Sequence, residues 1–200
     1  MSDFLNISAF VLIIVFLIAS MFLQTSTENN AHPIEKPLNK NINKVADGLY
    51  ITNFINATDY KALKALGVRQ ILIVGTELPR HGEPLFKVMT VRIDDHPDVN
   101  IKKHFNSTYN FINHGPTLVH CAAGISRSAT IVAAFLMRKY NLTADKAVSH
   151  IKKCRSIVQP NNGFMNQLHQ FEKDLQKADG AGQDDSSSDS SSDESSENST

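Results

Sequence analysis

The chain has 200 residues, enough for one domain of ordinary size with terminal segments. Its net charge of zero hides an asymmetry, because residues 181–200 hold six acids and no base, which leaves 20 bases against 14 acids, a charge of +6, in the first 180 residues. This excess of bases does not indicate nucleic-acid binding, because the sequence has no dense stripe of Lys and Arg. Its two cysteines lie far apart, which argues against a disulfide framework.

The first segment of the chain is strongly apolar from residue 4 to 23, and Ala9 to Ala19 form an unbroken apolar run. About 20 such residues span a bilayer as a helix. A cleavable signal peptide and an interfacial helix are the alternatives. A signal peptide requires a positive start, whereas the first residues carry Asp3 and no Lys or Arg, and Ala19-Ser20 is a poor cleavage site. We therefore predict a transmembrane anchor at 1–24.

Residues 25–44 are rich in Asn and interrupted by two prolines, which predicts a polar linker. The bases nearest to the apolar segment, Lys36, Lys40 and Lys44, all follow it. The positive-inside rule then places the rest of the chain in the cytosol as a single-pass protein. The apolar core is short for a span, which favours an internal membrane such as the endoplasmic reticulum over the thicker plasma membrane.

Residues 45–178 have the pattern of a globular domain in which strands alternate with helices. Strands are predicted at 48–51, 68–74, 87–93 and 117–119, and helices at 58–66, 101–113, 129–140, from 143 onwards and at 164–177. Valine and isoleucine dominate the longer strands. This alternation predicts an α/β fold with a central, mostly parallel sheet flanked by helices.

The segment from His120 to Ser128 carries the strongest functional signal. Cys121 and Arg127 stand six positions apart, between the last predicted strand and a predicted helix. A loop in this setting directs several backbone N–H groups to one point, in front of the positive end of the helix dipole. The residues between Cys121 and Arg127 are Ala122, Ala123, Gly124, Ile125 and Ser126. The segment predicts a binding loop for a dianion such as phosphate.

The same loop favours covalent chemistry over the alternative of a merely structural, buried cysteine. A helix N-terminus and a nearby cation favour the thiolate form of Cys121. Arg127 can clamp two phosphate oxygens with its planar guanidinium, and Gly124 lets the backbone approach the ligand closely. A reactive thiolate needs a reducing compartment, which agrees with the cytosolic placement.

The loop resembles the Cys-x5-Arg signature of cysteine-dependent protein phosphatases, and its Ala-Gly-Ile-Ser-Arg-Ser run resembles their dual-specificity branch, which acts on Ser/Thr and Tyr. The resemblance covers about residues 45–176 and includes 94–97 and 159–168. It implies a protein tyrosine phosphatase-like fold, a phosphoprotein substrate and a phospho-cysteine intermediate. It implies no metal or other cofactor, and the scattered histidines show no ligand spacing.

The resemblance also implies a general acid, an Asp on a loop shortly before a helix. Two neighbouring residues compete for this role. Asp95 lies ten residues before Phe105, the spacing expected between the acid and an aromatic residue of the helix, and it is favoured over Asp94. Either carboxylate could instead cap a turn.

Three supporting residues follow from the resemblance. Ser128 would stabilise the thiolate as it leaves, or would alternatively cap the helix. His120 would order the loop by hydrogen bonds, and Asn161 would brace it from outside. The chain departs from the family at Arg155-Ser156, where Arg-Pro is frequent.

The predicted activity is hydrolysis of phosphotyrosine and phosphoserine or phosphothreonine in proteins. The loop has no lysine, which would favour inositol phospholipids, and the short domain lacks room for the aromatic recognition segment of tyrosine-only phosphatases. Two alternatives are a phosphatase for a non-protein phosphate such as a phosphoinositide, and an inactive phospho-binding module.

Residues 179–200 form a Ser, Asp and Glu tract of low complexity, which predicts a disordered tail because it cannot bury apolar surface. Ser186, Ser190 and Ser191 each have an acid three positions later, the pattern of an acidophilic kinase site. The alternative is a tail that only adds solubility.

Overall fold

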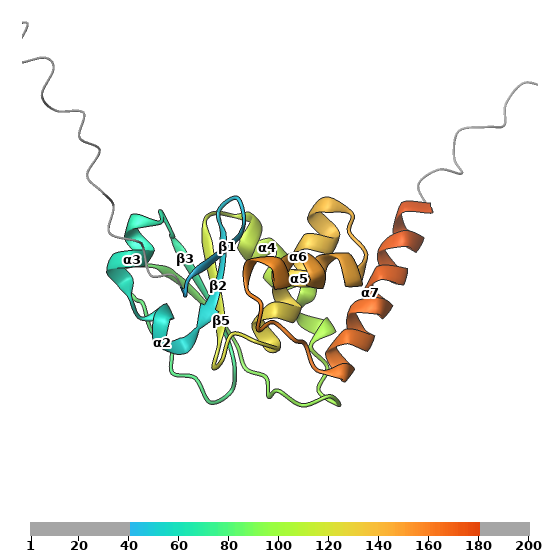
Figure 1. Cartoon of the computed structure of the whole chain (residues 1–200), viewed down its shortest axis with the longest axis horizontal. Helices are drawn as coiled ribbons and strands as arrows, with labels where there is room; N and C mark the ends of the chain where they lie inside the picture. Colours follow the sequence, from blue (N-terminus) through green and yellow to red (C-terminus); the bar gives the residue numbers. More distant parts are fainter. Residues whose placement is uncertain (1–40, 181–200) are drawn as a thin grey trace, which may run out of the picture. The chain divides into compact units, whose positions relative to one another are not determined.

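Five strands form a sheet at the centre of the structure, a computed structural model that describes residues 41–180 (Figure 1). In spatial order they are β1 (Asn43–Ala46), β2 (Leu49–Asn53), β5 (Thr117–Cys121), β3 (Gln70–Val74) and β4 (Lys87–Val91). Neighbours pair in parallel, except for the antiparallel pair of β1 and β2. All five residues of β3 and of β5 are buried, as expected for inner parallel strands covered on both faces.

Helices cover both faces of this sheet (Figure 1). One face carries two short helices, α2 (Phe54–Ala57) and α3 (Tyr60–Ala65). The other face carries the 3₁₀ turn η1 (Lys102–His104) and the helices α4 (Phe105–Asn113), α5 (Arg127–Tyr140), α6 (Ala144–Cys154) and α7 (Asn162–Gly180). This mostly parallel sheet between helices confirms the predicted α/β class.

Side chains of β5 alternate between two apolar clusters. Leu118 belongs to the cluster that includes residues of α3, whereas Val119 and Cys121 belong to the cluster formed with α4, α5, α6 and α7. Successive side chains of a strand point to opposite faces of the sheet. Cys121 therefore lies on the α5 side, and His120 lies on the side of α2 and α3.

Two elements are absent from the sequence-based prediction. Strand β1 begins at Asn43, inside the stretch predicted as the 25–44 linker, and it is held by pairing with β2. Helix α2 has only four residues, too few for a periodic pattern, and Asn53 caps it by accepting a hydrogen bond from the Asn56 N–H at 2.9 Å. Both elements depend on contacts or capping that hydrophobic periodicity does not reveal.

The predicted helix at 101–113 is divided into the η1 turn and α4, although Asn100 accepts a hydrogen bond from the Lys103 N–H as a cap would. Helix α7 starts at residue 162, two positions earlier than predicted, and extends to residue 180, two positions beyond the predicted end of the domain.

No helix within residues 41–180 is long and apolar enough to cross a membrane. The anchor predicted at 1–24, residues 25–40 of the predicted linker and residues 181–200 of the tail predicted at 179–200 lie outside the described residues.

Candidate active site

The loop between β5 and α5 has each of its carbonyl groups hydrogen-bonded from outside. The contacts to the carbonyl oxygens of residues 121 to 126 come, in order, from His120 Nδ1 (3.4 Å), Phe54 N (3.1 Å), Arg155 Nη2 (3.1 Å), Arg155 Nε (2.9 Å), Gln159 N (3.0 Å) and Thr130 N (2.9 Å). In a planar trans peptide the N–H of the next residue points away from the carbonyl. The N–H groups of residues 122–127 are therefore turned to the inner side of the loop.

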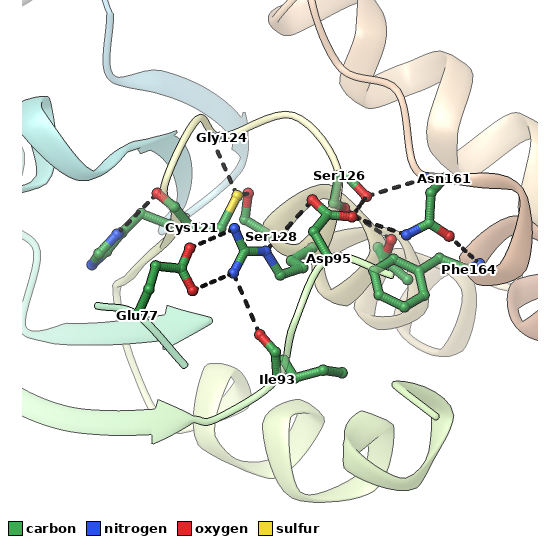
Figure 2. A network of polar contacts seen from close by, with 12 residues as sticks. Glu77, Ile93, Asp95, Cys121, Gly124, Ser126, Ser128, Asn161 and Phe164 are labelled. Atoms are coloured by element: carbon green, nitrogen blue, oxygen red, sulfur yellow. Dashed lines mark hydrogen bonds and ion pairs between the residues drawn. The ribbon is translucent and has the colours of Figure 1, made fainter. Parts of the chain in front are cut away.

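The inner side of the loop faces the thiol of Cys121 (Figure 2). The Gly124 N–H donates to Cys121 Sγ at 3.2 Å, which confirms the inward direction at that peptide. Gly124 has a positive φ of 68°, and a Cβ there would collide with the backbone carbonyl of Thr52. A residue with a side chain would open the loop at this point, so the tight curve requires glycine.

Cys121 is buried on the inner side of this loop, with 1% of its surface exposed. Its Sγ lies 3.2 Å from the hydroxyl oxygen of Ser128, in the first turn of α5. The structure thus places the serine hydroxyl and the Gly124 N–H on the same sulfur, where both can donate to a thiolate.

Arg127, at the other end of the loop, is held by a carboxylate. Glu77 binds the guanidinium with both oxygens, at 2.8 Å to Nη1 and 2.7 Å to Nη2. Nη1 also lies 3.4 Å from the Ile93 carbonyl oxygen. The buried Nε has no hydrogen-bond partner within residues 41–180, although a carboxylate oxygen of Asp95 lies 3.5 Å away. The guanidinium edge formed by Nε and Nη2 is therefore the edge left for a phosphate.

The charges around Arg127 favour its ionised form. Burial opposes the charge, but the hydrogen bond to Glu77 and the nearby Cys121, Glu77 and Asp95 groups together raise the pKa of the guanidinium. The same hydrogen bond from Arg127 lowers the pKa of Glu77. Both shifts favour the ionised forms of the pair.

The structure distinguishes between the two neighbouring acids. Asp95 Oδ1 accepts hydrogen bonds from Ser126 Oγ at 2.7 Å and from Asn161 Nδ2 at 2.9 Å, beside the loop (Figure 2). Asp94 is exposed and makes no hydrogen bond or ion pair with the described residues. The site thus brings together Cys121, Arg127 and Asp95, and leaves Asp94 in solvent.

Asn161 lies against the outside of the loop and makes three separate contacts. Its side-chain amide binds Asp95, its backbone N–H donates to Ser126 Oγ at 3.1 Å, and its Oδ1 accepts from the Phe164 N–H at 2.9 Å. The last contact caps α7. Asn161 therefore holds the Asp95 carboxylate, the loop and the start of α7 relative to each other.

Three residues of the site are absent from the sequence-based prediction of its members. Glu77 binds Arg127, His81 contacts His120, and Arg155 donates to two loop carbonyls and to Asn43 Oδ1 at 3.0 Å. Burial lowers the pKa of Arg155. Each of these contacts joins residues at least 31 positions apart, so no local pattern could have identified them.

The part of the chain that contains this site is similar to known proteins. A family model described as the catalytic domain of dual specificity phosphatases matches residues 49–174. Dual specificity protein phosphatase 1 of Arabidopsis thaliana is 38% identical over 141 residues, covering 68% of this chain and 71% of that protein. Human dual specificity protein phosphatase 1 is 37% identical over 132 residues, covering 64% of this chain and 36% of that protein. The chain thus spans about a third of the human relative.

A similar relationship appears among solved structures. The crystal structure of DUSP15 superposes with a TM-score of 0.61 at 36% sequence identity, covering 68% of this chain and 95% of that one. The matched region contains the loop of residues 121–127 and the elements that support it. This chain therefore belongs to the dual specificity phosphatase family and is a cysteine-based protein phosphatase.

Proposed function

We propose that this protein removes phosphate from tyrosine, serine and threonine residues of proteins through a phospho-cysteine at Cys121. The observation that carries the proposal is the loop of residues 121–127, whose carbonyls are all bonded from outside, so that its N–H groups face the thiol. A ring of inward N–H groups at a helix start fits the three equatorial oxygens of a phosphoryl group.

In the first step the Cys121 thiolate attacks phosphorus, and the bond from phosphorus to the substrate oxygen breaks. That oxygen leaves with a proton from Asp95, because an alkoxide is a poor leaving group. Asp95 Oδ1 accepts two hydrogen bonds, whereas Oδ2 accepts none from the described residues. Oδ2 lies 3.5 Å from Arg127 Nε, beside the guanidinium edge left for phosphate, so it is the oxygen placed to carry the proton. Arg127 and the loop N–H groups hold the phosphoryl oxygens through this step.

In the second step a water molecule attacks the phosphorus of the phospho-cysteine. The Asp95 carboxylate takes one proton from the water, the sulfur–phosphorus bond breaks, and inorganic phosphate forms. The Ser128 hydroxyl, 3.2 Å from Cys121 Sγ, donates to the thiolate as it leaves. The enzyme returns to its starting state with Asp95 protonated again.

The loop favours a protein substrate over a highly charged lipid. Ala122 and Ala123 are exposed at its rim and carry no charge. A phosphoinositide headgroup has several phosphates and would gain little from this neutral rim. The alternative of a binding module without activity lacks support, because the nucleophile, the arginine and a carboxylate lie together in one site.

Two further proposals rest on the sequence alone. The apolar segment at 4–23 would anchor the protein in an internal membrane, with the catalytic domain in the cytosol. The serines of the 179–200 tail would be substrates of an acidophilic kinase.

The direct test uses the full chain in detergent with p-nitrophenyl phosphate and a panel of phosphopeptides and phosphoinositides. Cys121→Ser should abolish turnover and retain phosphate binding, because the change is nearly isosteric. Cys154→Ser, at the other free cysteine, serves as the matched control and should retain full activity. More than a few percent of activity in Cys121→Ser would exclude the covalent mechanism, and preference for phosphoinositides would replace the protein substrate by a lipid.

A further inference from the structure

A chain of four polar groups approaches the phosphate loop from the face of the sheet opposite to Cys121. Tyr60 Oη lies 3.2 Å from His81 Nδ1, His81 Nε2 lies 2.9 Å from His120 Nε2, and His120 Nδ1 lies 3.4 Å from the Cys121 carbonyl oxygen. His120 has no exposed surface, and His81 is half-buried. His81 comes from the loop between β3 and β4, which also carries Glu77.

The imidazole rings of His81 and His120 are both neutral at physiological pH. Burial, and secondarily the neighbouring His81, lowers the pKa of His120 to about 4, and burial also lowers the pKa of His81. A neutral imidazole has one N–H donor and one bare nitrogen acceptor. Two facing Nε2 atoms at 2.9 Å therefore require a proton on one ring and a lone pair on the other.

The ends of the chain decide where the protons lie. A carbonyl oxygen can only accept, so His120 must carry its proton on Nδ1 to bind the Cys121 carbonyl. His120 Nε2 is then bare and accepts from the Nε2–H of His81. His81 Nδ1 is in turn bare and accepts from the Tyr60 hydroxyl. The opposite arrangement would set the bare Nδ1 of His120 against a carbonyl lone pair.

We propose that His81 is a positioning residue for the phosphate loop, which acts by donating its Nε2–H to His120 and so holding His120 in the Nδ1–H tautomer that binds the Cys121 carbonyl. The consequence reaches the ligand, because fixing that carbonyl also fixes the Ala122 N–H on the opposite side of the same peptide. The role of this N–H in holding a phosphate oxygen rests on the proposed function.

The surroundings of His81 are built to keep its ring in place. Its ring centre lies 5.0 Å from that of His120, 5.7 Å from that of Phe54 in an edge contact and 6.1 Å from that of Tyr60 in a stacked contact. The loop that carries His81 also binds Arg127 through Glu77. One connection between β3 and β4 therefore supports the phosphate loop at both ends, at the cysteine side and at the arginine side.

The first test reads the tautomer without any reaction. In the full chain labelled with ¹⁵N-histidine, two-dimensional ¹H–¹⁵N spectra at neutral pH should show His120 protonated on Nδ1 and bare on Nε2. In His81→Leu, His120 Nε2 loses its donor, and the spectrum should shift toward the Nε2–H form or a mixture. A wild-type His120 protonated on Nε2 would overturn the proposal, whether or not any variant folds.

The second test measures the loop by its affinity for inorganic phosphate. His81→Leu should weaken binding by roughly 10-fold, because it leaves a buried acceptor unpaired. His81→Gln keeps an N–H donor near the same place and should recover most of the affinity and the Nδ1–H tautomer. His114→Leu, which removes an exposed histidine from the end of α4, is the matched control and should change neither the affinity for phosphate nor the His120 tautomer.

The outcomes separate this inference from the proposed function. Wild-type affinity together with an unchanged His120 tautomer in His81→Leu would exclude the positioning role while the enzyme remains active. A wild-type protein that neither binds phosphate nor turns over a phosphate ester would contradict the proposed function, and the tautomer of His120 would still decide the role of His81.

Discussion

Asp95 and Asp94 are adjacent acids with different surroundings, and the difference predicts different roles. Asp95→Asn should lower turnover of an alkyl phosphate by roughly 10²–10³-fold, because an amide cannot donate the proton that the leaving oxygen needs. The loss should shrink for an aryl phosphate with a good leaving group. Steady-state kinetics with both substrates provides the measurement.

Asp94→Asn is the matched control for this prediction, since it makes the same change one position earlier in an exposed side chain. It should alter turnover only slightly. A larger effect at Asp94 than at Asp95 would contradict the spacing argument and identify Asp94 as the general acid.

His120 is a buried histidine whose pKa is lowered from 6.5 to about 4, chiefly by burial, and this predicts acid-sensitive stability. The unfolded chain takes up a proton near pH 6.5, whereas the folded chain does so only near pH 4. Above pH 6.5 the neutral His120 therefore does not reduce the free energy of unfolding. As the pH falls from 6.5 to 4, proton uptake by the unfolded chain lowers that free energy by about 3 kcal/mol.

Urea unfolding of the full chain at pH 7, 5.5 and 4 checks this window. His120→Asn removes the titrating group and should have a flatter pH dependence over the same range. If the free energy of unfolding changes equally with pH in the two proteins, His120 contributes no proton linkage.

At the scale of elements, the end of α6 supports the phosphate loop through Arg155. This buried guanidinium donates to the Ala123 and Gly124 carbonyls and to Asn43 of β1. Arg155→Met keeps most of the side-chain volume but leaves these acceptors without their donor. We expect a loss of about 2–4 kcal/mol in the free energy of unfolding and weaker phosphate binding.

Chemical denaturation and phosphate titration measure both effects. Lys152→Met, an exposed position on the same helix, is the control and should change the free energy of unfolding by less than about 0.5 kcal/mol. If Arg155→Met and Lys152→Met behave alike, the loop keeps its shape without the hydrogen bonds from Arg155.

At the scale of the whole molecule, the apolar segment before the linker predicts a membrane-bound enzyme. Deletion of residues 1–24 should release an active protein into the cytosolic fraction, and added protease should digest the domain on sealed vesicles without detergent. Protection of the domain inside vesicles, or glycosylation of the Asn106 or Asn141 sequons, would instead indicate a secretory signal peptide.

The sequence alone determined the nucleophile loop, because its parts are contiguous. Cys121, the small loop residues and Arg127 lie between a strand and a helix, and this local order is sufficient to predict a phosphate cradle. The α/β class was equally readable from the valine- and isoleucine-rich strands that alternate with helices. The family model matches residues 49–174, which include this loop, and so confirms the predicted family.

Only the tertiary structure decided which residues complete that loop. Glu77 and Arg127 are 50 positions apart, His81 and His120 are 39 apart, and Arg155 and Gly124 are 31 apart. The spacing to Phe105 already favoured Asp95 over Asp94, and the fold adds the contacts of Asp95 with Ser126 and Asn161, which lie 31 and 66 positions away. Sequence patterns record local periodicity and contiguous motifs, whereas these contacts arise only when the parallel strands bring distant loops to one edge of the sheet.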